Sequence, residues 1–265
     1  MSTRNSKQSK AAARERLRLE REKEAKRAKV RRQIIVAAGV VVVLAAAGGI
    51  AVAVNNANKP GYWDAAAKKP LVKPANTSGT DGTVIVIGDK SNKNVVKEYE
   101  DLRCPICAAY EQEAGDAVLQ GAKDGKYQID YTFGTFLDDG ASPGQGSKRA
   151  LSAVGAALNV STDAFEQYHK LLYSKAYHPD ENTDKFKDTA YLLKIADKVP
   201  ALKGNTKFSD AVKKGTFDKW ALTMSKAFNK SGVNSTPTVK VNGKAVSVPG
   251  MPSATVVSSI AADLK

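Results

Sequence analysis

The longest hydrophobic pattern in the chain is an uncharged run of 21 residues, from Ile34 to Val54, made almost entirely of Ile, Val, Leu, Ala and Gly. A helix of that length rises about 1.5 Å per residue and spans roughly 30 Å, which is the thickness of the hydrocarbon core of a bilayer. The run therefore predicts one transmembrane helix over residues 34–54.

Two alternatives to a retained membrane anchor fit this run less well. Ala51-Val52-Ala53 has the small-x-small form of a signal-peptide cleavage site, but signal peptides carry shorter apolar segments of about 7–15 residues. A buried helix of a soluble protein would need protein on every face. An uncleaved signal-anchor is the prediction, with cleavage after Ala53 as its competitor.

After residue 54 the chain first has a polar segment and then segments with the hydrophobic periodicity of strands and helices. Residues 55–82 are rich in Pro, Gly, Asn and Lys and predict a linker. Strands are predicted at 83–87, 94–101 and 127–133, with a helix over 105–122 between the last two. A strand, a helix and a strand within about 40 residues predict a βαβ unit with parallel strands.

The second half of the chain is helical before it returns to strand. Apolar residues at helical spacing predict an inserted helical block at about 140–230, in which Ser161 or Thr162 and Thr183 are candidate N-caps. Residues 238–248 then form two apolar runs around Asn-Gly, a strong hairpin signal, and Ser253 can cap a last helix. This order of elements predicts an α/β fold.

The distribution of charged residues predicts the orientation of the transmembrane helix in the membrane. Residues 1–33 contain 13 Lys and Arg against 4 Glu, so only +5 of the formal net charge of +14 belongs to the rest of the chain. Basic residues before an apolar helix predict a cytoplasmic tail and place everything after Val54 outside the membrane. Nucleic-acid binding is disfavoured because the basic residues are concentrated in the tail.

The chain has two cysteines, Cys104 and Cys107, separated by two residues. A structural disulfide this short closes almost no loop, and a structural zinc site needs more ligands than two cysteines provide. The two histidines, His169 and His178, show no triad partner and are assigned to the surface or to packing. We therefore predict redox chemistry with no metal and no cofactor other than the cysteine pair.

The strand-to-helix junction gives the two cysteines different roles. Cys104 is expected at a helix N-terminus, where free N–H groups and the helix dipole favour a thiolate, so it is the predicted nucleophile. Cys107 lies one turn further in and is the predicted resolving thiol.

With these residues the chain resembles the thioredoxin superfamily, and within it the DsbA-like extracytoplasmic disulfide oxidoreductases. The resemblance covers residues 83–265 and rests on the segment Glu98-Tyr-Glu-Asp-Leu-Arg-Cys-Pro-Ile-Cys107, on the inserted helical block and on Ser235-Thr-Pro-Thr238. It implies a thioredoxin-like fold with a helical insertion, held outside the membrane by one N-terminal helix.

The resemblance also implies roles for individual residues. Pro237 is expected to be cis and to face the cysteines, and Thr236 to offer backbone hydrogen bonds to a substrate chain beside Pro105 and Ile106. Glu98, six residues before Cys104, is expected to be a buried acid and is the candidate proton shuttle. Ile106 stands where strong oxidants often carry His, and its side chain has no hydrogen-bond donor.

The function implied by the resemblance is oxidation of dithiols in exported client proteins, followed by reoxidation by a membrane protein of the DsbB or VKOR type. A disulfide reductase or isomerase, for instance in cytochrome c maturation, is the first alternative. A non-catalytic thioredoxin-like binding module of the cell envelope is the second. The motif alone does not choose the direction of electron flow.

Overall fold

The structure, a computed structural model, describes residues 61–140 and 142–265, and Tyr62–Lys265 form one unit. The predicted tail, the predicted transmembrane helix and the start of the predicted linker lie outside the described residues. Within the described ranges, every helix is too short or too polar to cross a membrane.

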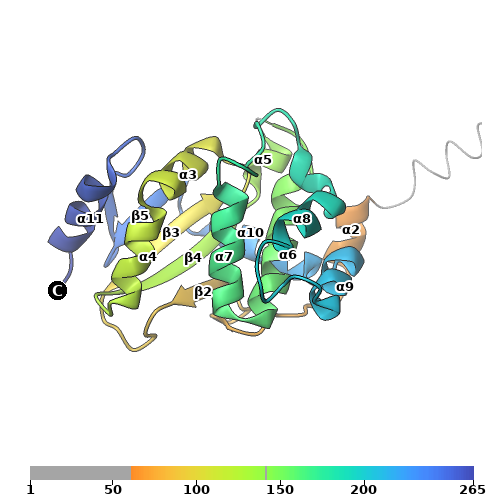
Figure 1. Cartoon of the computed structure of the whole chain (residues 1–265), viewed down its shortest axis with the longest axis horizontal. Helices are drawn as coiled ribbons and strands as arrows, with labels where there is room; N and C mark the ends of the chain where they lie inside the picture. Colours follow the sequence, from red (N-terminus) through yellow and green to blue (C-terminus); the bar gives the residue numbers. More distant parts are fainter. Residues whose placement is uncertain (1–60, 141) are drawn as a thin grey trace, which may run out of the picture. The chain divides into compact units, whose positions relative to one another are not determined.

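A six-stranded mixed sheet forms the centre of the unit (Figure 1). Its order is β1-β2-β4-β3-β5-β6, in which β3 and β4 are parallel and all other neighbours are antiparallel. Glu98 lies opposite Tyr131 on one side and Val239 on the other, so β3 is an interior strand. The strands are β1 (Thr77–Ser78), β2 (Val84–Ile87), β3 (Val95–Asp101), β4 (Gln128–Gly134), β5 (Thr238–Val241) and β6 (Lys244–Val246).

Helices cover both faces of this sheet. Alternate side chains of a strand point to opposite faces, and on β3 Glu100 contacts His169 of α7 while Tyr99 contacts Phe228 of α10. Helices α7 and α10 therefore lie on opposite faces, as Figure 1 shows. The helices of the inserted block are α5 (Phe136–Asp139), α6 (Gly146–Val160), α7 (Thr162–Tyr173), α8 (Thr189–Ala196), α9 (Thr206–Lys214) and α10 (Asp218–Lys230).

The helix that begins directly after Cys104 is continuous, but it contains one π-helical turn. It begins as α3 (Pro105–Tyr110), passes through a π-helical turn, η1 (Glu111–Gly115), and ends as α4 (Asp116–Lys123). A single α-helix was predicted here; π-turns frequently occur at functional sites. The chain closes with α11 (Ser253–Ala262).

Most predicted elements are confirmed within one or two residues. The Asn-Gly hairpin joins β5 to β6, and Asn242 (φ 49°) and Gly243 (φ 91°) both have the positive φ that a type I′ turn requires. Ser161 caps α7 by accepting a hydrogen bond from the Ala164 amide. The helical insertion between β4 and β5 is also confirmed, which establishes a thioredoxin-like α/β fold with an inserted helical subdomain.

Two local predictions are wrong, and one helix has no counterpart among the predicted elements. Thr183 does not cap a helix: Lys185–Lys187 form a 3₁₀ turn, η2, and Asp188 caps α8 through the Ala190 amide. Ser253 begins α11 but makes no side-chain cap. Helix α9 was not predicted, because its pattern contains only Phe208 and Val212 as buried positions.

The predicted linker is also wrong from residue 62 onward. Helix α2 (Tyr62–Ala67) and strand β1 occupy this segment. The Tyr62 hydroxyl donates to Asp218, the guanidinium of Arg149 lies 3.8 Å from the centre of the Tyr62 ring, and the Trp220 indole donates to the Gly82 carbonyl at 2.7 Å. Packing on α6 and α10 therefore orders a segment whose composition alone indicated a linker.

Candidate active site

The two cysteines lie where β3 leads into α3. Cys104 is the N-cap residue of α3, with an extended backbone, and Pro105 follows at the first helical position, where its missing N–H is no loss. The Cys104 sulfur accepts a hydrogen bond from the Cys107 amide, with 3.4 Å between N and Sγ. The N-terminus of α3 thus directs a backbone donor at the first thiol.

The environments of the two thiols shift their pKa values in opposite directions. Hydrogen bonding from the Cys107 side chain, assisted by Thr236 and by backbone amides, lowers the pKa of Cys104 to about 6 in spite of partial burial. Burial raises the pKa of Cys107 well above its ordinary value, and the charges of Glu100 and Cys104 raise it further. Near neutral pH the site therefore holds a Cys104 thiolate beside a protonated Cys107.

The predicted substrate-binding residues surround Cys104. The Thr236–Pro237 peptide bond is cis, and the Cys104 thiol lies 3.6 Å from the Thr236 carbonyl oxygen. Pro105 and Ile106 are exposed, and Ile106 retains 49% of its surface in solvent. The structure thus brings together all four residues proposed to hold a substrate chain.

Behind Cys107 the sheet carries two buried acids on the same face, Glu98 and Glu100. Burial raises the pKa of Glu98 well above its ordinary value, and the charges of Glu111 and Glu100 add to the shift. Neither oxygen of the Glu98 carboxyl has a hydrogen-bond partner among the described residues. Glu98 is buried as the resemblance implied, but Glu100 is the carboxyl whose charge raises the pKa of Cys107.

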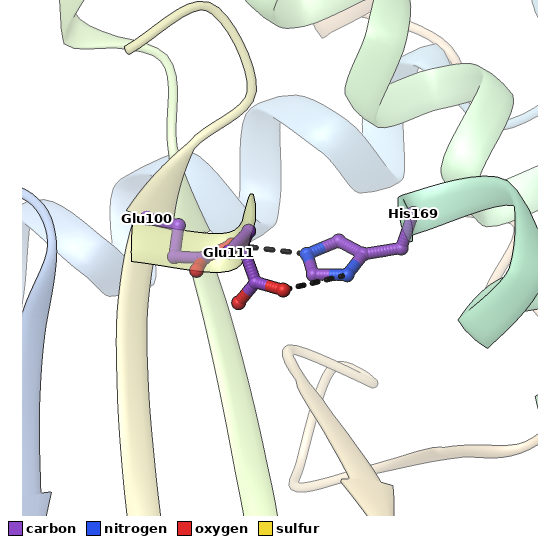
Figure 2. A group of neighbouring side chains, drawn as sticks. All are labelled: Glu100, Glu111 and His169. Atoms are coloured by element: carbon purple, nitrogen blue, oxygen red, sulfur yellow. Dashed lines mark hydrogen bonds and ion pairs between the residues drawn. The ribbon is translucent and has the colours of Figure 1, made fainter. Parts of the chain in front are cut away.

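Glu100 is joined to the helical insertion through a histidine. The His169 Nε2 lies 3.0 Å from the Glu100 Oε2, and its Nδ1 lies 4.0 Å from the Glu111 Oε2, so the ring stands between two carboxyls (Figure 2). Burial lowers the pKa of His169 and raises that of Glu100 to about 8. The assignment of His169 to the surface or to packing missed this contact, whereas His178 does pack between Tyr173 and Phe186.

These three side chains offer ligand atoms within 4.8 Å of one another, which is a spacing compatible with a metal ion. However, the two ring nitrogens of His169 face different carboxyls, and only one nitrogen of a ring can ligate a given ion. The geometry fits the exchange of protons between the three groups better than it fits a metal centre.

Arg103 is not among the predicted site residues, but it anchors the turn before Cys104. Its buried guanidinium contacts Asp138 at 2.8 Å and donates to the carbonyls of Ser142 and Glu181. Two loops of the insertion therefore hold the residue next to the predicted nucleophile. A basic residue just before a CxxC motif was the available signal, but nothing local identified its distant partners.

Comparison with solved structures places this arrangement among known oxidoreductases. Oxidised DsbA from Mycobacterium tuberculosis is 28% identical and superposes with a TM-score of 0.54, covering 68% of this chain and 99% of that one. Reduced DsbG from the same organism is 26% identical with a TM-score of 0.54, covering 69% and 94%. MdbA, a thiol-disulfide oxidoreductase from Actinomyces oris, is 20% identical with a TM-score of 0.61, covering 75% and 93%, and shows likeness of fold alone.

The two Mycobacterium tuberculosis neighbours are DsbA-like thiol–disulfide oxidoreductases, which supports a general role in thiol–disulfide exchange. No curated protein sequence matches the chain significantly. The family model described as thioredoxin matches residues 80–255, which include both cysteines and the cis-proline. Because this match spans well over half of the 265 residues, the chain belongs to the thioredoxin family.

Proposed function

We propose that the protein oxidises dithiols of exported client proteins through a Cys104–Cys107 disulfide. The observation that carries this proposal is the position of Cys104 at the N-cap of α3, where its sulfur accepts a hydrogen bond from the Cys107 amide at 3.4 Å and its pKa is lowered to about 6, while burial raises the pKa of Cys107. Stabilising the Cys104 thiolate stabilises the reduced form of the enzyme, and a stabilised reduced form makes the disulfide a stronger oxidant.

The proposed reaction begins when a client thiolate attacks the Cys104 sulfur of the oxidised enzyme. The bond between Cys104 and Cys107 breaks, a bond between Cys104 and the client forms, and Cys107 leaves with the electron pair and takes up a proton. A second client thiolate then attacks the client sulfur of this mixed disulfide, so that the client gains a disulfide and Cys104 leaves as a thiolate. The client is oxidised by two electrons and the enzyme is reduced by two.

The surroundings of Cys104 support the binding of an extended client segment. The Thr236 carbonyl oxygen lies 3.6 Å from the Cys104 sulfur, where it can accept a hydrogen bond from a client backbone amide. Pro105 and Ile106 add an exposed apolar rim. The enzyme would thus recognise backbone and apolar surface, which suits clients that are still unfolded.

The cellular setting forms part of the same proposal. The predicted anchor at 34–54 and the basic tail before it support a catalytic unit held outside the cell membrane, where disulfides persist. A membrane reoxidant of the DsbB or VKOR type would accept the electrons from reduced Cys104 and Cys107. The Mycobacterium tuberculosis neighbours, the disulfide bond oxidoreductase DsbG and DsbA, are consistent with this assignment.

The test is the equilibrium of the full chain with glutathione, together with client trapping. A reduction potential near about −120 mV supports the oxidase, and one near about −270 mV, the value of thioredoxin, overturns it in favour of a reductase. The variant Cys107→Ala should accumulate mixed disulfides on Cys104 with exported proteins. Loss of all exchange in Cys104→Ala is expected, and a parent chain whose client oxidation does not exceed that of Cys104→Ala would favour the non-catalytic binding module.

A further inference from the structure

Cys107 requires a proton in a place that solvent does not reach. On the proposed function, it leaves as a thiolate each time a client attacks Cys104, and it must lose its proton again each time it closes the disulfide. Its surface is 0% exposed. A buried, unpaired charge is unstable, so proton movement to and from this sulfur must pass through protein groups.

We propose that Glu100, His169 and Glu111 form a proton relay between the Cys107 sulfur and the cavity at η1 and α7. This inference rests on the proposed thiol–disulfide exchange and assigns the transfer of its proton. It also moves the shuttle from Glu98, which the resemblance implied, to Glu100, and extends it through a histidine that the insertion supplies.

The inner end of the relay lies beside Cys107. Glu100 is the last acid of β3 on the face that looks toward the π-turn, and its charge acts on the thiols of both Cys104 and Cys107. Asp101, the next residue, accepts a hydrogen bond from the Cys104 amide at 2.8 Å, which ties the end of β3 to the turn that carries the cysteines. Tyr173 of α7 packs edge-on against His169, with 5.0 Å between the ring centres, and burial together with the charges of Glu100 and Cys107 raises the pKa of its phenol.

The middle of the relay is the imidazole of His169. Its Nε2 is 3.0 Å from Glu100, and its Nδ1 is directed to Glu111 at 4.0 Å, as Figure 2 shows. A neutral imidazole can accept a proton at one nitrogen and release one from the other. Burial keeps this ring neutral by lowering its pKa, against the charges of Glu111 and Glu166 that favour protonation.

The outer end of the relay is open to water. Glu111 and His169 both line a cavity of about 240 Å³, which is roomy enough for several water molecules. The cavity is also lined by Asp116 and Lys170, whose side chains are 73% and 64% exposed, so it communicates with the surface. A water in this cavity, or a rotation of the Glu111 carboxyl, can bridge the 4.0 Å between the His169 Nδ1 and the Glu111 Oε2.

Other titratable groups face the relay without completing it. Burial raises the pKa of Tyr110 and Tyr131, and the charge of Glu98 adds to both shifts. Of Glu98, Tyr110 and Tyr131, Tyr131 alone lines the cavity. They influence the charge of Glu100 and Glu111 but offer no continuous contact from Cys107 to the cavity.

The experiment uses the reduced full chain and the aromatic disulfide 5,5′-dithiobis(2-nitrobenzoate) in a stopped-flow instrument. In the first phase Cys104 attacks the reagent and releases one thionitrobenzoate. In the second phase Cys107 loses its proton to Glu100 and attacks the Cys104 sulfur. The Cys104–Cys107 bond forms, the bond to the reagent breaks, and a second thionitrobenzoate leaves while the proton exits through Glu111.

The decisive variant is His169→Gln, because glutamine keeps a donor and an acceptor but cannot pass a proton along a ring. We expect the first phase to stay within twofold of the parent rate. The second phase should slow at least tenfold, lose its dependence on pH near neutrality, and recover when free imidazole is added. His178→Gln, the matched control at the other histidine, should leave both phases unchanged.

The outcomes separate the relay from the proposed function. A parent that shows neither phase overturns both ideas. Two normal phases in His169→Gln overturn the relay alone, and so does a slow second phase that imidazole does not restore, since that result indicates a structural role. If His169→Gln does not fold, Glu111→Gln decides in its place, with the same slow, buffer-sensitive second phase expected.

Discussion

Cys104 and Cys107 are the same residue type and lie three positions apart, but the surroundings of the two thiols are very different. The outer side, formed by Cys104, Thr236, Pro237 and the exposed Ile106, offers backbone hydrogen-bonding groups and an apolar rim. The inner side, formed by Cys107 and the cluster of Glu98, Glu100, Glu111 and His169, is buried and acidic.

The comparison shows how one short motif makes two unlike thiols. On the outer side, donors near the sulfur stabilise negative charge and lower the pKa of Cys104 to about 6. On the inner side, burial and neighbouring carboxyls disfavour negative charge and raise the pKa of Cys107. The difference therefore comes from the surroundings and not from the residue type.

The largest expected effect is the difference in alkylation rate between the two thiols. With iodoacetamide at pH 7, Cys104 of the reduced chain should react at least about a hundredfold faster than Cys107, because only the thiolate is nucleophilic. Peptide mapping by mass spectrometry measures both sites in one sample. Equal labelling of the two cysteines in the folded chain would contradict the opposite pKa shifts of Cys104 and Cys107.

The next effect concerns the acids of the inner side. Folding raises the pKa of Glu98 from its ordinary 4.5 and that of Glu100 to about 8. The native state therefore keeps protons that the unfolded chain loses, and the free energy of unfolding should fall as pH rises from 4.5 toward 8. Glu98→Gln should reduce that slope by up to about 1.4 kcal/mol per pH unit.

Urea denaturation across this pH range measures the effect of Glu98→Gln. The matched control is Glu113→Gln, because Glu113 is exposed and glutamine keeps an acceptor for the Ser253 amide. The control should retain the parent slope. A parent chain that gains stability between pH 4.5 and 8 would contradict the assignment of the inner side as a set of protonated acids.

A smaller effect tests how far the two sides depend on each other. The Cys107 side chain is the largest cause of the low pKa of Cys104, so Cys107→Ala should move the titration midpoint of Cys104 upward from about 6. The pH dependence of alkylation measures this midpoint. The Cys104 midpoint of Cys107→Ser, which keeps a hydrogen-bond donor, should stay closer to that of the parent. Identical midpoints in the parent, Cys107→Ala and Cys107→Ser would show that the pKa of Cys104 does not depend on the Cys107 side chain.

The smallest effect lies on the outer side alone. Thr236 contributes less than Cys107 to the low pKa of Cys104, so Thr236→Val should raise the midpoint by less than Cys107→Ala does. Thr238→Val is the matched control, since the Thr238 hydroxyl donates to the Ser235 carbonyl and not to the cysteine. A larger shift in Thr236→Val than in Cys107→Ala would reverse the order of the two causes.

The sequence by itself determined the parts of this protein that depend on local spacing. Alternation and helical periodicity predicted the strands, the helix after the cysteines and the insertion, and Asn-Gly predicted the hairpin turn. The position of Cys104 at a helix start followed from the strand before it and from Pro105. Glu111 also had a local signal, because it lies four residues after Cys107 on the same helical face.

Only the tertiary structure decided which distant groups meet. His169 lies 69 residues from Glu100, and no pattern in either segment indicates the other. The same holds for Arg103 with Asp138 and for Tyr62 with Asp218. Periodicity identifies the face of an element, whereas the pairing of faces depends on how the whole chain packs, and the pKa of each buried group depends on that packing.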